Sequence, residues 1–97
     1  MLFSNKPNRK KIESHVFAEI NNSLLDVGLP RDSSFEAAFQ SMITRLGNWA
    51  KQERLGDWKR SIMMGVIEEY FRITCKRVVN KQQMDYYVKS ARQKILY

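Results

Sequence analysis

RKKIESHVFAEINNSLLDVGLP, residues 9–30, decides the fold class of this chain. Its apolar residues recur every four positions, at Ile12, Val16, Ile20 and Leu24. Because an α-helix turns once every 3.6 residues, these side chains share one face. Gly28 fits the left-handed backbone position just past a helix, and Pro30 cannot continue the helix. The stretch therefore predicts an amphipathic helix over residues 9–27 that ends at a glycine.

The same spacing predicts a second helix from Ser33 to about Gly56. Ser33 and Glu36 have the spacing of a capping box, in which each residue satisfies a free backbone N–H of the other. Gly47 lies inside the apolar pattern, where it weakens the helix by about 1 kcal/mol relative to alanine and is typical of a close helix contact. The apolar stripe of this helix comprises Phe35, Ala38, Phe39, Met42, Leu46, Trp49 and Ala50.

Two further helices complete the pattern. The third begins with Asp57 as its cap and runs to about Val79. Its apolar residues, which include Trp58 and Ile73, cover about half of the helical circumference, so we expect it to be the central helix. The fourth follows Asn80, a plausible cap with Gln83 three residues on. Its narrower stripe comprises Met84, Tyr87, Val88, Ala91 and Ile95.

No segment alternates apolar and polar residues between hairpin turns, so strands are not expected. The connections are short, and short connections favour antiparallel neighbours. The sequence predicts one all-α domain over residues 1–97, a compact bundle or irregular array of about four helices. Residues 1–8 form a basic N-terminal arm. The second and third helices can also be interpreted as one long helix kinked at Gly56.

Several classes of protein are excluded by composition. No apolar run approaches the roughly 20 residues that span a bilayer, and the N-terminus starts apolar and then turns basic, the reverse of a signal peptide. The single cysteine, Cys75, cannot form an internal disulfide, which agrees with a reducing compartment. We therefore expect a cytoplasmic protein with no membrane partner.

Catalysis is not expected, because the residues that it requires are isolated. The only histidine, His15, lies one turn from Glu19, which is an ordinary surface pairing. Glu68 and Glu69 are adjacent and point about 100° apart on a helix, so they do not form a carboxylate pair. One cysteine and one histidine give no metal-ligand cluster, and no glycine-rich phosphate loop is present. We expect neither cofactor, metal nor small-molecule substrate.

The distribution of charge favours a nucleic-acid partner, DNA or RNA. The chain has 17 basic and 10 acidic residues, for a net charge of +7, and the excess lies near both ends. Lysine and arginine that meet phosphates release counterions, which supplies most non-specific affinity. No helix-turn-helix pattern fits, so contacts are expected mainly with the backbone. The candidate nucleic-acid-binding residues are Lys6, Arg9, Lys10, Lys11, Lys59, Arg60, Lys76, Arg77, Lys81, Lys89, Arg92 and Lys94.

Two alternatives remain open. Basic residues near helix C-termini also complement the helix dipole, which accounts for Lys76, Arg77 and Lys94 without a ligand. A protein-protein adaptor is the second alternative, since Met64, Tyr86 and Leu96 fall outside the main apolar stripes and would form an exposed interface, or the contact of a homo-oligomer. Both activities combine in a small helical subunit of a nucleoprotein assembly.

Overall fold

The computed structural model describes residues 7–25, 27, 32–75 and 80–97, and of Cys75 only the backbone. Within these residues the chain forms helices and no strand, which confirms the all-α prediction. The four helices are α1 (Arg9–Leu24), α2 (Ser33–Gln52), α3 (Asp57–Tyr70) and α4 (Lys81–Ile95), and a π-helical turn, Phe71–Cys75, continues α3.

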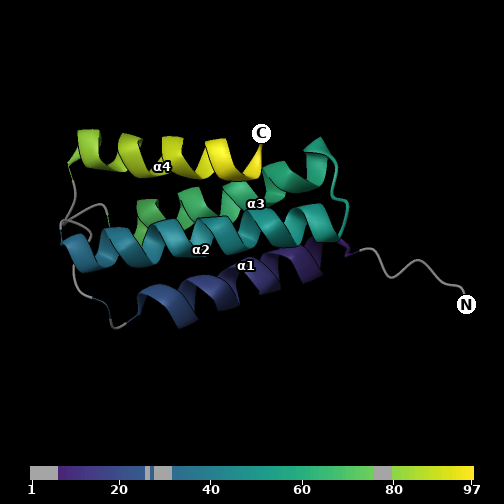
Figure 1. The fold of residues 1–97 in the computed structure, drawn as a ribbon, viewed down its shortest axis with the longest axis horizontal. Coiled ribbons are helices and arrows are strands. Elements are labelled where there is room, and N and C mark those ends of the chain that lie inside the picture. Colours follow the sequence, from purple (N-terminus) through teal and green to yellow (C-terminus); the bar gives the residue numbers. More distant parts are fainter. Residues whose placement is uncertain (1–6, 26, 28–31, 76–79) are drawn as a thin grey trace, which may run out of the picture.

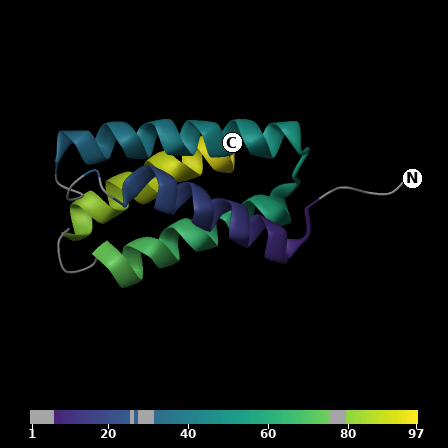
Figure 2. The ribbon, with the colours of Figure 1, turned by 90° about the horizontal axis from the view of Figure 1, so that it is seen from below.

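Consecutive helices alternate in direction along the bundle, as predicted (Figure 1). α1 packs against α2 and α3, and α4 packs against the same two helices. α2 and α3 therefore lie diagonally across the bundle, as do α1 and α4 (Figures 1 and 2). The expectation that the third helix is central was wrong, because α3 is one of four helices around a shared core.

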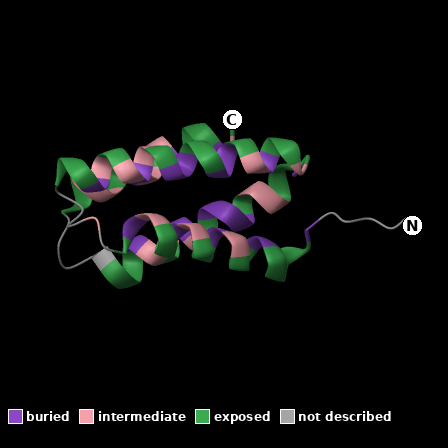
Figure 3. Cartoon of the chain, turned by 60° about the horizontal axis from the view of Figure 1, so that its bottom comes forward, coloured by how far each residue is buried: buried purple, intermediate pink, exposed green. Residues whose placement is uncertain are grey.

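The core takes side chains from all four helices, whose inward faces are buried and whose outward faces are exposed (Figure 3). The four predicted apolar residues of α1 are each at most 3% exposed. At the centre, Phe39 of α2 lies edge-on to Tyr87 of α4, with ring centroids 4.9 Å apart, and to Phe71, with centroids 5.5 Å apart. Edge-to-face pairs of this kind add about 0.5–1.5 kcal/mol beyond area burial.

The predicted cap of the fourth helix is confirmed. The Asn80 side chain accepts a hydrogen bond from the Gln83 N–H at 2.8 Å, and the Gln83 side chain accepts one from the Asn80 N–H at 3.3 Å. α1 is capped in a similar way, because Asn8 Oδ1 accepts a hydrogen bond from the Lys11 N–H at 2.9 Å. Both helix starts thus satisfy backbone donors that have no partner within the helix.

The second helix begins at Ser33 as predicted, but the caps of the second and third helices each lie one residue before the predicted one. The cap of α2 is Asp32 and not Ser33, and Asp32 makes no side-chain capping hydrogen bond. Glu36, the expected partner of Ser33, accepts a hydrogen bond from the Tyr86 hydroxyl of α4 instead. The cap of α3 is Gly56, so that Asp57 is the first helical residue. A carboxylate in the first turn still complements the positive end of the helix dipole.

α2 ends at Gln52, four residues before the glycine that was expected to end it. The Leu55 N–H donates to the Ala50 carbonyl at 2.9 Å and the Arg54 N–H donates to the Lys51 carbonyl at 3.1 Å, which is the Schellman pattern. Arg54 occupies its left-handed position, with φ 57°, and Leu55 is buried behind it. This turn makes α2 and α3 two antiparallel helices rather than one long helix.

Gly47 makes the close helix contact that its position indicated. A Cβ atom at this position would lie 2.6 Å from the backbone carbonyl oxygen of Lys94 in α4. Backbone cannot move aside as a flexible side chain can, so α2 and α4 approach this closely only because residue 47 has no side chain.

α3 is shorter than expected. The third helix was predicted to reach about Val79, whereas α3 ends at Tyr70 and the π-helical turn carries the chain to Cys75. Residues 76–79 lie outside the described part of the chain. The predicted end of the first helix, at residue 27, was also late, since α1 ends at Leu24.

Candidate nucleic-acid interface

One end of the bundle is strongly basic. α1 begins, α2 ends and α3 begins at this end (Figure 1), which brings residues 9–13 and 51–60 together. We call these two segments the basic end. Their acidic residues are Glu13, Glu53 and Asp57. Their basic residues are Arg9, Lys10, Lys11, Lys51, Arg54, Lys59 and Arg60.

Two of these cations are engaged within the protein. Arg9 lies 3.5 Å from Glu13, one turn along α1. Arg60, which the sequence suggested as a nucleic-acid contact, is partly buried, and its guanidinium donates to the carbonyls of Leu55 at 2.9 Å and Ile95 at 2.8 Å. Arg60 therefore ties the end of α4 to the turn before α3, and these contacts occupy two of its donors.

The other five cations of the basic end form no ion pair with any residue that the structure describes. Four of them are exposed and Lys59 is half-buried. Arg54 is also held in the left-handed conformation, which costs a residue with a Cβ roughly 1–2 kcal/mol. We call these five residues the free cations, namely Lys10, Lys11, Lys51, Arg54 and Lys59.

The opposite end of the bundle, where α2 and α4 begin and α3 ends, shows no excess of basic side chains among its described residues. Its acidic residues are Asp32, Glu36, Glu68, Glu69 and Asp85. Its basic residues are Lys81, Arg72, which pairs with Glu69, and Arg92, which pairs with Glu68. Within the described part of the chain, cations without an ion pair therefore gather at the basic end.

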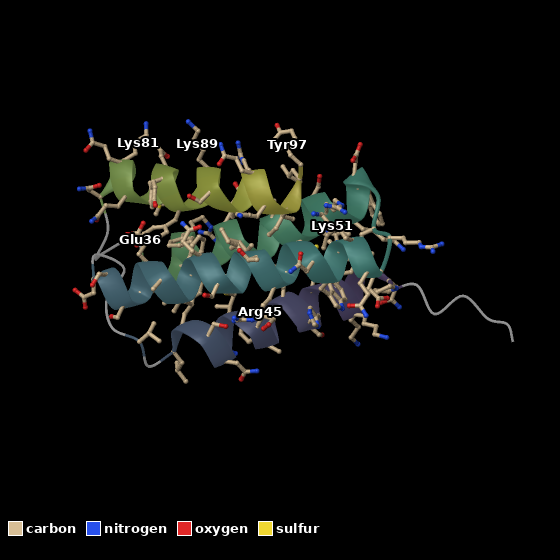
Figure 4. All side chains as sticks on the ribbon, in the orientation of Figure 1. Glu36, Arg45, Lys51, Lys81, Lys89 and Tyr97 are labelled. Atoms are coloured by element: carbon tan, nitrogen blue, oxygen red, sulfur yellow. The ribbon has the colours of Figure 1, made fainter. Side chains whose placement is uncertain are left out.

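Of the candidate cations of α4, Lys81, Lys89 and Arg92 do not join the basic end, whereas Lys94 precedes Ile95, whose carbonyl accepts a hydrogen bond from Arg60 of that end. Lys81 and Lys89 point outward from α4, away from the rest of the bundle (Figure 4). Arg92 lies 3.7 Å from Glu68 of α3. Because α1 and α4 are diagonal to each other, Lys10 and Lys11 do not share a continuous face with the α4 residues. Lys94 is exposed on the last turn of α4, and Lys6, Lys76 and Arg77 lie outside the described residues.

Sequence reasoning missed Lys51 and Arg54. Both lie in the middle of the chain, in a stretch that carries a small net negative charge, and only the fold brings them beside α1. Figure 4 shows Lys51 close to the end of α2. A signal was present in the sequence, because the last turn of one helix and the first turn of the next carry Lys51, Arg54, Lys59 and Arg60 within ten residues.

The three residues suggested as a protein interface have different environments. Tyr86 is 48% exposed, and the hydrogen bond that it donates to Glu36 raises the pKa of its phenol above the ordinary value of 10.0. Met64 was expected to be exposed but is buried, since α3 packs against both α1 and α4 and thus buries a wider arc than one stripe. Leu96 is half-buried against the core.

An apolar groove of about 860 Å³ lies between α1 and α3. Trp58 and Ile73, which the sequence placed in the core, are each 64% exposed in this groove, and Phe17 of α1 is 58% exposed beside them. The wide apolar arc of the third helix, which suggested a central position, is thus explained by a core face plus this open groove. The other apolar groups that line the groove are Ile62, Val66 and Tyr70.

His15 packs against an aromatic side chain of α2. Its ring stacks on Trp49 of α2, with centroids 3.9 Å apart. Glu19, its expected partner, instead lies 3.4 Å from Arg45. In the described part of the chain no three histidine, cysteine or acidic residues gather to hold a metal ion. No helix there is both long and apolar enough to cross a membrane.

The comparisons with known proteins give no relative for this chain. No protein-family model, no curated protein and no solved structure matches it.

Proposed function

We propose that this protein is a non-catalytic subunit of a nucleoprotein assembly that binds nucleic-acid phosphates through its basic end. The observation that carries the proposal is the group of five free cations at one end of the bundle. Cations that form no ion pair within the protein remain available to a phosphate, and counterion release then supplies binding free energy without regard to base sequence.

The surroundings of the free cations support the proposal. α1 and α3 both begin at the basic end, and helix N-termini carry a partial positive charge that favours phosphate. The bundle is 23 × 21 Å across. Because successive phosphates of one DNA strand advance about 3.4 Å along the axis, a face of this width spans about six of them.

The backbone of Arg54 supports the same site. A left-handed conformation is cheap for glycine and costly for arginine, so this position carries a charged side chain at the expense of stability. Strained residues persist at functional sites more often than elsewhere. Arg54 lies at the turn between α2 and α3, where its side chain is exposed.

The test compares two double variants with the same change of charge. Lys10→Glu combined with Lys51→Glu reverses two free cations, whereas Lys81→Glu combined with Lys89→Glu reverses two cations on α4. Fluorescence anisotropy with labelled single-stranded and duplex DNA and RNA measures the dissociation constants, and circular dichroism verifies that each variant folds.

The proposal expects the basic-end variant to bind at least tenfold more weakly than the wild type, and the α4 variant to lose no more than about threefold. Equal losses in the two variants would mean that net charge alone governs binding. Unchanged binding by the basic-end variant would refute the assignment of the site.

A further inference from the structure

We propose that the groove between α1 and α3 is the surface through which two copies of this chain form a two-fold symmetric dimer. The groove runs along α3 and its π-helical turn and along the first half of α1. It exposes large apolar side chains of each, Phe17 from α1 and Trp58 and Ile73 from α3 and the turn. None of the free cations lines this groove, so the proposed phosphate contacts would leave its apolar side chains exposed.

The groove gathers large exposed apolar side chains of both helices in one patch. Phe17 is 58% exposed and Trp58 is 64% exposed, and Ile73 adds to the same surface. The largest apolar patch of a protein surface is often an interaction site.

The charges around the groove favour a second copy over an unlike partner. The charged residues that line the groove are Arg9, Glu13 and Glu69. Arg9 pairs with Glu13, and Glu69 pairs with Arg72 beside the groove, so the rim is nearly neutral. A chain with a net charge of +7 repels its own copies through any cationic face, whereas this face offers no such repulsion. An unlike, oppositely charged partner finds no free charge among the rim residues that the structure describes.

The position of the basic end favours an antiparallel arrangement of the two copies. Arg9 lies at the end where α1 and α3 begin, and Glu69 lies near the other end. A two-fold interface joins the same patch on both subunits. In the antiparallel arrangement the Arg9–Glu13 pair of one copy meets the Glu69–Arg72 pair of the second copy. The two basic ends then lie far apart, which minimises their repulsion.

Gly65 provides a further reason to expect close contact. It lies in the middle of α3, is exposed and lines the groove. A Cβ atom at this position would meet no atom of the protein within 4 Å, in contrast to Gly47. The packing of the single chain therefore does not require glycine here, although glycine weakens a helix. A second copy that approaches the backbone of α3 accounts for it.

The size of the groove sets the expected strength of the dimer. α3 and its π-helical turn extend about 28 Å at 1.5 Å per residue, and two adjacent helices are roughly 20 Å wide. The face thus presents about 560 Å² per copy, near the lower limit for a specific interface. We therefore expect a dimer that dissociates in the micromolar range.

Sedimentation equilibrium of the purified chain between about 1 and 300 µM, without nucleic acid, tests the proposal independently of phosphate binding. The wild-type mass is expected to rise from 11.5 kDa towards twice that value as concentration increases. Phe17→Glu places a charge in the groove, and Gly65→Leu adds a bulky side chain whose Cβ meets no atom of the single chain within 4 Å. Both variants are expected to raise the dissociation constant at least tenfold.

Leu25→Glu is the matched control, because Leu25 is 74% exposed and does not line the groove. Its dissociation constant is expected to stay within about twofold of the wild type. A wild-type mass of 11.5 kDa at every concentration would overturn the proposal and assign the groove to a different protein or to stacked bases. Dimerisation of both groove variants at wild-type strength would overturn it as well.

Discussion

Arg54 is the residue at which stability and the proposed function oppose each other. Its φ of 57° is favourable for glycine, and its exposed guanidinium is one of the free cations. We expect Arg54→Gly to raise the free energy of unfolding by about 0.5–1 kcal/mol, because the left-handed strain is relieved and part of the gain is offset by the entropy of glycine. We expect the same variant to bind nucleic acid more weakly.

Urea denaturation and anisotropy measure the two effects separately, and Arg54→Ala is the matched control. Alanine removes the charge and retains the strained backbone, so it is expected to lose affinity as glycine does without any gain in stability. If Arg54→Gly were more stable yet bound nucleic acid as tightly as the wild type, Arg54 would have no part in the interface.

At the level of the helices, two glycines inside helical patterns have opposite roles. Gly47 allows α2 and α4 to approach, and an added Cβ would collide with a backbone oxygen at 2.6 Å. Gly65 faces open space in the single chain. We expect Gly47→Ala to lower the free energy of unfolding by about 1–3 kcal/mol through overpacking. We expect Gly65→Ala to raise it by about 0.5–1 kcal/mol through helix propensity.

Chemical denaturation measures the free energy of unfolding of both variants. The protein concentration is kept below the range in which the proposed dimer forms. The two variants replace the same residue type with the same side chain in the same secondary structure, so each is the control for the other. If both variants changed the free energy of unfolding by the same amount, the close approach of α2 and α4 would not prevent a side chain at residue 47.

Helix existence could be predicted from the sequence better than helix ends. The four-residue spacing in α1 and the cap at Asn80 depend on local chemistry, and the structure confirms both. The end of α2 was misplaced because the prediction required a glycine, whereas Arg54 accepts the left-handed position. Hydrophobicity alone also assigned Trp58 to the core, because periodicity does not separate a buried face from an exposed apolar groove.

The spacing of residues along the chain did not predict how the four helices pack against one another. Nothing in the spacing of apolar residues specifies that α2 and α3 lie diagonally, yet this topology brings the first turn of α1 beside the turn between them. The net charge of successive stretches of sequence therefore did not predict which basic residues lie together on the surface. Lys10 and Lys11 were identified from the sequence, whereas Lys51 and Arg54 emerge only when the helices are assembled.

The salt dependence of nucleic-acid binding by the wild-type chain tests the central claim most directly. If all five free cations meet phosphates of a duplex, the slope of log K against log salt concentration is about −4.5, and affinity falls about 500-fold between 50 and 200 mM salt. Anisotropy titrations on two unrelated base sequences are expected to give this slope for both. No binding at 50 mM salt, or binding insensitive to salt, would contradict a phosphate-binding role for the basic end.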